Sequence, residues 1–409
     1  MHHAHPERTT TSGAATERLP VGALLALAMT GFICIASETL PAGLLPLMAG
    51  GLGVTSSMAG QTVTAYALGS LLAAIPLTIA TRRWRRRSVL LLTIAGFLVF
   101  NTLTAVATDF TLILAARFCA GMAAGLAWSL LAGYARRMVA ARQQGRAMAI
   151  AMVGTPVALS LGVPLGAWLG AALGWRTAFG VMSALCLVLI VWVLAKVPDY
   201  PGQTGRQRLP LRRVLATPGV CPVLATVIAW MLAHNILYTY IAPFVGQAGL
   251  QEHVDLILLV FGVAALAGIW IAGRLVDSHL RPMVLASLGG FAVLSLALVW
   301  LAAQPLTMII VVAAWGLSFG GAATLLQTAL ADAAGESADV ALSMNVVAWN
   351  GAIAGGGLVG GVLLESHGPS SFPLVMAAIL TAGFAIAWWS KEHGFRPGAR
   401  STRVRHGGH

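Results

Sequence analysis

Two short polar loops decide how this chain is interpreted: ATRRWRRRSVL at residues 80–90 and LVDSHLRPMVL at residues 275–285. Each joins two long apolar segments. The loops correspond when the chain is shifted by about 195 residues, as do the stretches ARFCAGMAAG and AWGLSFGGAA. The aligned residues are Arg82 with Asp277, Arg117 with Trp315, and Gly166 with Gly360. Three matches at nearly one spacing predict a duplicated unit, so we expect two related halves.

The composition is typical of a chain surrounded by lipid. Hydrophobic residues make up 58% of the 409 residues and charged residues only 9%, whereas a soluble domain has about 25% charged residues. The polar residues gather in short islands between apolar runs, where they could not cover a water-exposed surface. We therefore expect an all-α membrane protein and exclude an ordinary soluble enzyme.

Apolar segments long enough to cross a membrane occur twelve times. A helix needs about 20 predominantly apolar residues to span the hydrocarbon core. The expected spans are 21–48, 58–80, 88–108, 110–134, 146–171, 175–196, 220–245, 254–276, 282–303, 305–331, 340–364 and 372–390. Six fall in each half, which predicts two pseudo-symmetric six-helix bundles.

A polar, proline-containing stretch near the midpoint, PDYPGQTGRQRLPLRRVLATP at residues 198–218, separates the halves. The expected parts are an amino-terminal tail at 1–20, bundles at 21–197 and 220–390, a linker at 198–219, and a carboxy-terminal tail at 391–409. The histidines near the amino terminus are interpreted as part of a tail, not as a metal site.

The basic residues indicate orientation rather than a nucleic-acid partner. The formal net charge is +12, but the Lys and Arg residues cluster in alternate loops, the linker and the tails. With the amino terminus inside, only Arg176 faces outward and Arg117 lies in the membrane. Because cytoplasmic loops carry the excess of Lys and Arg, we expect both termini to be cytoplasmic in a multi-pass protein of the inner (plasma) membrane. We expect a monomer with no nucleic-acid partner.

The two polar loops also carry a resemblance to the major facilitator superfamily, over nearly the whole chain. The family's loop reads Gly, three residues, Asp, Arg, then Gly and basic residues. The first copy here has Thr78 and Arg82 at the Gly and Asp positions, while the second keeps Gly273 and Asp277. The resemblance implies the twelve-helix facilitator fold and a gating function for these loops. The implied gating residues are Arg82, Arg85, Arg86, Gly273, Asp277 and Arg281.

A second set of motifs resembles the exporting branch of that family. Arg117 is followed by Gly121 and Gly125, like the family's intramembrane arginine with its glycines. The segment at 146–171 resembles the antiporter signature, through Gly154, Pro156, Gly162, Pro164 and Gly166. Together with GWRTAF, LYTYIAPF and NVVAWNGAIAGG, these motifs resemble the drug:proton antiporter group that includes sugar and purine nucleoside efflux permeases. The resemblance implies export of a small solute driven by the proton gradient, without another cofactor.

One carboxylate lies deep in an expected span. Glu38 is ten residues from the outer end of its span, whereas the other acidic residues fall in tails, loops or near span ends. An ionisable group near the bilayer centre costs a few kcal/mol and is a default candidate for a functional site. Arg117, at a similar expected depth, is its candidate partner. We interpret Glu38 and Arg117 as the proton-coupling pair, with a fixed structural ion pair or an arginine that only braces helices as the alternatives.

Polar residues in the second half predict the wall of a substrate cavity. His234, Asn235, Tyr238 and Tyr240 put four polar side chains into seven residues, and His234 and Tyr238 share a helix face. Polar groups facing lipid would stay without hydrogen bonds, so part of this face should line a cavity or contact other helices. The predicted cavity residues are His234, Asn235, Tyr238, Trp315, Gln327, Asn345 and Asn350.

Two alternatives stay open at this point. A proton-coupled symporter or a uniporter of the same fold would move the solute inward. An intramembrane enzyme would need converging catalytic groups, which one isolated carboxylate does not supply, so we expect no enzyme. The chain also has no Gly-Lys-Ser/Thr phosphate loop to support transport driven by ATP.

Overall fold

The computed structural model describes residues 19–140, 143–202 and 211–398, and every regular element in these ranges is helical. Eleven of the helical stretches are long and apolar enough to cross a membrane. The expected all-α membrane architecture is confirmed. The rest of the predicted tails, and residues 203–210 of the predicted linker, lie outside the described residues.

The helices of the first half begin and end at residues with a local reason to do so. The side chain of Thr55 accepts a hydrogen bond from the Met58 N–H, and that of Asp109 from the Leu112 N–H, which caps two helix starts. Gly53 ends α1 with φ of 65°, a conformation that favours glycine. The elements are α1 (Val21–Leu52), α2 (Ser56–Thr81), α3 (Arg86–Val106), α4 (Phe110–Arg137), α5 (Gln144–Met152), α6 (Gly154–Val157), the π-helix Ala158–Gly162, α7 (Val163–Leu173) and α8 (Trp175–Lys196).

The second half follows a short helix in the linker. Its elements are α9 (Leu211–Leu215), α10 (Val220–Thr239), α11 (Ile241–Val245), α12 (Val254–Leu301), α13 (Pro305–Gly320), α14 (Ala322–Ala334), α15 (Ala338–His367) and α16 (Phe372–Trp389). Short 3₁₀ turns at Gly246–Ala248, Gln251–His253, Gly335–Ser337 and Pro369–Ser371 join some of them. Pro305 begins α13, where a missing backbone N–H costs no helical hydrogen bond.

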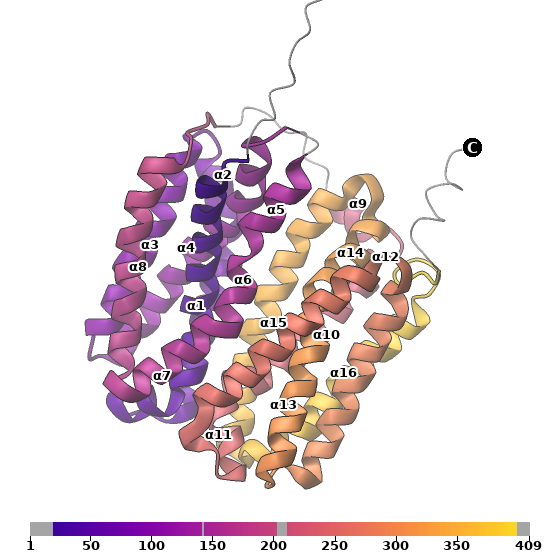
Figure 1. Ribbon diagram of the computed structural model, residues 1–409. Coiled ribbons are helices and arrows are strands. Elements are labelled where there is room, and N and C mark those ends of the chain that lie inside the picture. Colours follow the sequence, from indigo (N-terminus) through magenta and orange to yellow (C-terminus); the bar gives the residue numbers. More distant parts are fainter. Residues whose placement is uncertain (1–18, 141–142, 203–210, 399–409) are drawn as a thin grey trace, which may run out of the picture.

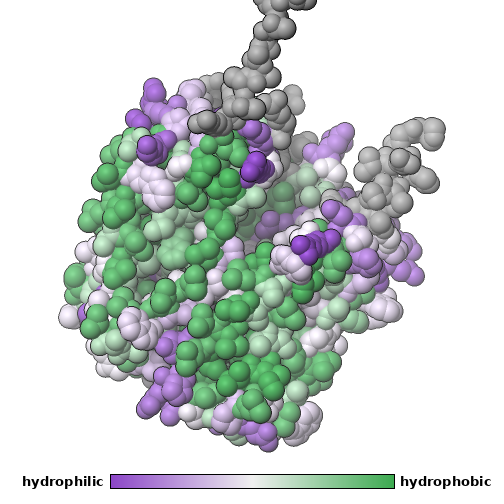
Figure 2. Space-filling view, viewed as in Figure 1, coloured by the Kyte–Doolittle hydropathy of each residue, from purple (hydrophilic) through white to green (hydrophobic). Residues whose placement is uncertain are grey.

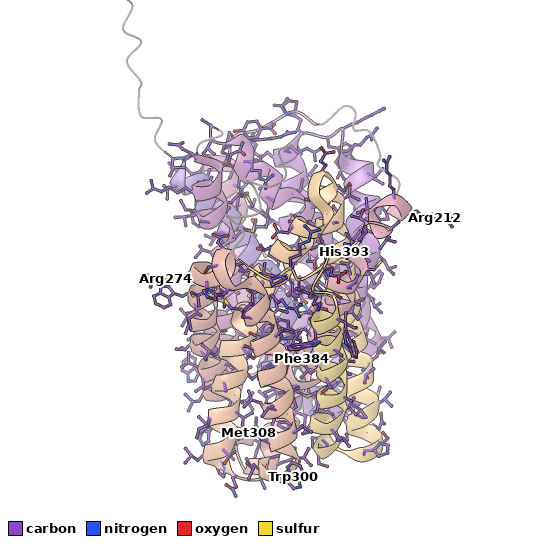
Figure 3. The ribbon with its side chains drawn as sticks, turned by 90° about the vertical axis from the view of Figure 1, so that its right-hand side faces the viewer. Arg212, Arg274, Trp300, Met308, Phe384 and His393 are labelled. Atoms are coloured by element: carbon purple, nitrogen blue, oxygen red, sulfur yellow. The ribbon has the colours of Figure 1, made fainter. Side chains whose placement is uncertain are left out.

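Two spans expected as separate helices form the single element α12. A straight helix of its 48 residues would be about 72 Å long, more than twice the thickness of a hydrocarbon core. It is not straight, because His279 has non-helical backbone angles (φ −132°, ψ 30°). In Figure 3 Arg274 lies near one end of this half and Trp300 near the other, so the second arm runs back across it. The loop expected between these spans is therefore a kink, and both apolar segments are helical.

Three other expected spans are interrupted. The span at 146–171 becomes α5, α6, a π-helix and α7; the span at 220–245 divides at Tyr240; and the span at 305–331 divides at Gly321. Pro156 and Pro164 lack the N–H that a continuous helix needs, which accounts for the irregular turns of the first. Irregular backbone at membrane depth is tolerated where it is buried in protein or lines a cavity. The interruptions therefore point to the interior between the halves.

The two halves lie side by side and are separated along part of their length (Figure 1). We call the end that carries α9 the linker end and the opposite end the far end. Figure 2 shows a hollow between the halves at the linker end. Across the halves, α2 packs on α15, α7 on α12, and α11 on α1, whereas α5 and α14 pack on helices of their own halves. The bundle is therefore closed toward the far end and open toward the linker end.

Glycines allow α2 and α4 to pack backbone against backbone. A Cβ atom added to Gly121 would overlap the backbone carbonyl of Tyr66, and one added to Gly69 would overlap that of Phe118. Small residues permit such close approach between membrane helices, where van der Waals packing is a main source of stability. This contact fixes α4, and with it Arg117, against α2.

Gly121→Ala is expected to destabilise the protein by about 1–3 kcal/mol, because the new methyl group forces the two backbones apart. Gly133→Ala in the same helix is the matched control, since nothing lies within 4 Å of a Cβ atom there. The measurement is the thermal unfolding midpoint of each purified variant in one detergent. Equal midpoints for the two variants would contradict the close-packing interpretation.

Candidate functional site

Among the acidic residues whose side-chain exposure the structure describes, Glu38 is the buried one. It lies on α1, where 20 of the 32 residues are buried, and it is 7% exposed. Within the described residues, no Lys, Arg or His nitrogen lies within ion-pair distance of its carboxylate, and the one ion pair there joins Arg85 and Asp199. Glu38 therefore lies in the interior of the protein.

Arg117 is fully buried but holds the backbone of α1 rather than the Glu38 side chain. Its Nη2 donates to the main-chain carbonyl of Glu38 and its Nε to that of Thr62, each at 3.4 Å. Its guanidinium carbon lies 4.7 Å from the ring centroid of Tyr66 and 5.6 Å from that of Phe179. The direct ion pair considered as an alternative is therefore wrong: α1 presents its carbonyl to the cation and leaves the carboxylate available.

Aromatic side chains from three elements of the second half form one cluster, which we call the aromatic cage: His234, Tyr238, Phe261, Trp315 and Phe319. The His234 ring stacks on Phe319 with centroids 3.6 Å apart and planes at 5°. It also stacks on Tyr238, at 5.1 Å, and lies 5.2 Å from Trp315. Three predicted cavity residues are thereby brought together. Phe261 and Phe319 were missed, because an apolar ring in an apolar span gives no signal of its own.

Three polar atoms of the cage are buried without a hydrogen-bond partner among the described residues: His234 Nδ1, Tyr238 Oη and Trp315 Nε1. Asn345 Oδ1 on α15 and Arg117 Nη1 on α4 are buried in the same way. Such an atom costs about 1–3 kcal/mol, so native structures hold few of them. The three within one cluster make the cage a candidate site for a polar ligand.

Tyr238 connects the cage to the first half. Its hydroxyl lies near Thr39 of α1 and within electrostatic reach of Glu38, without a hydrogen bond of full geometry. The side chain is 3% exposed, so it lies in the protein interior. The carboxylate of one half and the aromatic cage of the other are therefore close enough to interact electrostatically.

The other predicted cavity residues have different environments. The side-chain amides of Asn235 and Asn350 donate to carbonyls of their own helices, at Met231 and Val346. Both asparagines are buried, which fits a role in packing as well as in a cavity wall. Gln327 on α14 is exposed, on an element near the open linker end.

The glycines of the predicted antiporter helix pack against α1. A Cβ atom added to Gly154 would overlap the Ala28 carbonyl, and one added to Gly166 would overlap the Leu40 side chain. Gly162 meets the ring of Phe32 in the same way. Pro156 and Pro164 lie between these contacts, at the irregular turns. The glycines of this segment therefore allow it to pack closely against α1, the helix that carries Glu38.

A set of polar contacts that sequence reasoning missed closes the far end. The Tyr240 hydroxyl donates to the Gly357 carbonyl of α15 at 2.8 Å, and the Gln61 amide of α2 reaches that hydroxyl at 3.2 Å. Ser57 Oγ of α2 donates to the Gly361 carbonyl at 3.0 Å. The only signal in the sequence was Tyr240 beside the other polar residues of its span. We call these contacts the far-end gate.

Tyr240→Phe is expected to open the far-end gate more often, because it removes the hydroxyl that joins α10 to α2 and α15. One hydrogen bond contributes about 0.5–1.5 kcal/mol, so the population open at the far end should rise by a factor of about 2 to 10. Tyr134→Phe is the matched control, since the Tyr134 hydroxyl donates to Pro198 within one half. Spin-label distances across the far end measure the populations. An unchanged distribution in Tyr240→Phe would show that this hydroxyl does not hold the gate.

The first predicted gating loop is attached to the start of the linker. Arg85 forms an ion pair with Asp199, and the Arg87 N–H donates to the same carboxylate at 3.1 Å. Burial raises the pKa of Asp199, but these hydrogen bonds outweigh it and hold the pKa below its usual value. The stabilisation is therefore complete at neutral pH and is lost as pH falls through that lowered pKa. The loop has Arg82 at the position where the resembled motif has an aspartate. Asp199, at the start of the linker, supplies a carboxylate to this loop instead.

The remaining gating residues bind main-chain carbonyls or lie at the surface. Arg86 donates to the carbonyls of Thr81 and Arg82, at the end of its own loop. In the second copy, Arg281 donates to the carbonyls of Ala387, Trp388 and Phe395, around the end of α16. Gly273 and Asp277 are exposed on α12. In the first half, basic residues of the loop bind Asp199, just after α8. In the second half, Arg281 binds carbonyls at and just after the end of α16.

Comparisons with known proteins give one consistent result. The sequence model of the Major Facilitator Superfamily matches residues 27–354. A probable sugar efflux transporter of Haemophilus influenzae (strain PittGG) is 28% identical over 375 residues, 90% of this chain and 94% of the relative. The purine ribonucleoside efflux pump NepI of Escherichia coli O1:K1 / APEC is 30% identical over 352 residues, 84% of this chain and 87% of the relative.

A solved structure shows the same fold. A bacterial homologue of the human lysosomal transporter Spinster, in an inward-facing and unoccupied conformation, superposes with a TM-score of 0.70 at 13% identity. The match covers 93% of this chain and 98% of that chain.

Proposed function

The chain belongs to the major facilitator superfamily of membrane transporters, and we propose that it exports a small solute in exchange for protons. The relatives named above as efflux proteins move a sugar or a purine ribonucleoside, which supports the direction and the size of the solute. The single observation that carries the proton exchange is Glu38, a buried carboxylate without an ion-pair partner among the described residues.

Glu38 is placed to couple a proton to the solute. A carboxylate and a neutral carboxyl group differ by one charge, so each form favours a different arrangement of the surrounding dipoles. Tyr238 lies within electrostatic reach of Glu38 and belongs to the aromatic cage, so a change of charge at the carboxyl group acts on the cage through one side chain. We propose that solute and proton compete for this region, with the proton bound when the far end is open.

The charge pattern supports an orientation for this cycle. The Arg-rich loop at residues 82–87 and the linker helix α9 lie at the linker end, and the excess of basic residues favours the cytoplasm for this side. The hollow of Figure 2 then opens to the cytoplasm, which is the state that loads a solute for export. Opening the far-end gate would release the solute outside and admit a proton.

The experiment that tests the proposal uses inside-out membrane vesicles containing the full chain. An acidic lumen should drive uptake of a radiolabelled solute drawn from adenosine, D-ribose and tetraphenylphosphonium, and nigericin, which collapses the pH gradient, should abolish it. Vesicles without the protein are the control. Uptake in right-side-out vesicles driven by external acid, with none in inside-out vesicles, would instead establish the importing alternative.

A further inference from the structure

The aromatic cage contains a stacking surface that a ring of the protein itself occupies. The imidazole of His234 lies parallel to the Phe319 ring, with centroids 3.6 Å apart and planes at 5°. Tyr238, Phe261 and Trp315 surround this imidazole, with centroids between 5.1 and 5.8 Å from it. The dimensions of this site therefore match a planar heteroaromatic ring.

The edges of the cage carry hydrogen-bonding atoms that the described residues leave unused. His234 Nδ1, Tyr238 Oη and Trp315 Nε1 are buried without a partner there, and each residue is at most 5% exposed. The indole N–H can only donate, whereas the phenol can donate and accept. A ligand that satisfies both groups must offer at least one acceptor and one donor.

The cage itself holds no charged side chain. Its members are four aromatic residues and one histidine, and the nearest carboxyl group, Glu38, lies across the boundary between the halves. A permanently charged ligand would lose its hydration without gaining a partner in the cage. A free sugar has no planar aromatic ring that could stack on Phe319 as the His234 imidazole does.

We infer that the aromatic cage binds a neutral, planar heteroaromatic ring with at least one hydrogen-bond donor and one acceptor on its edge. The ring replaces the His234 imidazole on the face of Phe319 and takes hydrogen bonds from Trp315 and Tyr238. This inference rests on the proposed function, because it defines the part of the transported solute that the second half recognises.

The test is equilibrium binding of tritiated adenosine to the purified full chain in detergent, with no proton gradient. Adenosine and inosine should compete for the site, and D-ribose should not. Phe319→Leu, which keeps an apolar side chain but removes the ring, should weaken adenosine binding about three- to tenfold. Phe384→Leu is the matched control and should bind like the unmodified protein, since Phe384 borders a groove on the outer surface of α16 (Figure 3).

Trp315→Phe provides a second measurement that does not depend on how well Phe319→Leu folds. It keeps an aromatic ring and removes the indole N–H, so adenosine binding should weaken about three- to tenfold through the lost hydrogen bond. Unchanged binding in both variants, competition by D-ribose equal to that by inosine, or no binding of either nucleoside would overturn the inference. If D-ribose still accumulated in inside-out vesicles under a pH gradient, proton exchange would stand and only the ring site would be lost.

Discussion

Glu38→Gln is expected to abolish proton-driven accumulation of the solute while leaving its downhill exchange intact. Glutamine has nearly the shape of glutamate but can neither bind nor release a proton, so no proton competes with the solute and the bundle can still alternate with solute bound. The accumulation ratio in inside-out vesicles with an acidic lumen should fall to about 1, the value for a carrier that only equilibrates its solute. Exchange of labelled for unlabelled solute without a gradient should persist.

Glu365→Gln is the matched control for this prediction. Glu365 is an exposed carboxylate near the far end of α15, so the same change there should leave accumulation at the level of the unmodified protein. Full proton-driven accumulation by Glu38→Gln would show that another group carries the proton. Loss of both accumulation and exchange would instead assign Glu38 to the structure of the bundle.

Arg117→Met is expected to reduce proton-driven transport about tenfold or more. The charged guanidinium donates to the carbonyls of Glu38 and Thr62, and hydrogen bonds to charged groups contribute about 1.5–3 kcal/mol. Without them α1 loses its tie to α4 through Arg117, and the ionised Glu38 carboxylate loses the nearest buried cation. Methionine keeps an unbranched side chain between Tyr66 and Phe179, so the helix packing should persist.

Arg176→Met separates this effect from the general loss of an arginine. Arg176 also donates to a main-chain carbonyl, that of Ala107, and lies over an aromatic ring, that of Trp175, but it does so at the far end. Initial uptake rates and thermal unfolding midpoints should be measured for both variants. If the two variants lost transport equally, or if Arg117→Met failed to fold, Arg117 would be a structural brace rather than part of the coupling.

The local sequence explains why the positions of the helices could be predicted to within a few residues. The start of α8 and the start of α16 agree with the spans expected from apolar length alone, because lipid fixes how many apolar residues a crossing helix needs. The expected twelve spans are helical along most of their length, with the interruptions described above. The structure differs from the expected spans at His279 in α12 and at Tyr240 after α10. At each place the backbone angles of a few residues determine whether a helix continues, and composition does not encode those angles.

The candidate site could be predicted only in its polar members. Glu38 and Arg117 stood out because an ionisable residue in an apolar span is rare and expensive. Their relationship could not be predicted, since two residues at similar depth can meet through a side chain or through a backbone carbonyl. Asp199 was assigned to the linker, and only the folded chain brings it to Arg85.

The sequence by itself determined that this protein crosses the membrane many times, in two related halves, with one buried carboxylate, because those properties follow from hydropathy, repetition and the cost of charge in lipid. Only the tertiary structure decided which groups meet. Phe319 joins His234, Tyr240 closes on Gly357, and Arg117 holds the α1 backbone, through contacts between residues far apart in the chain. Such contacts depend on how helices pack against each other, which the periodicity of a single helix does not contain.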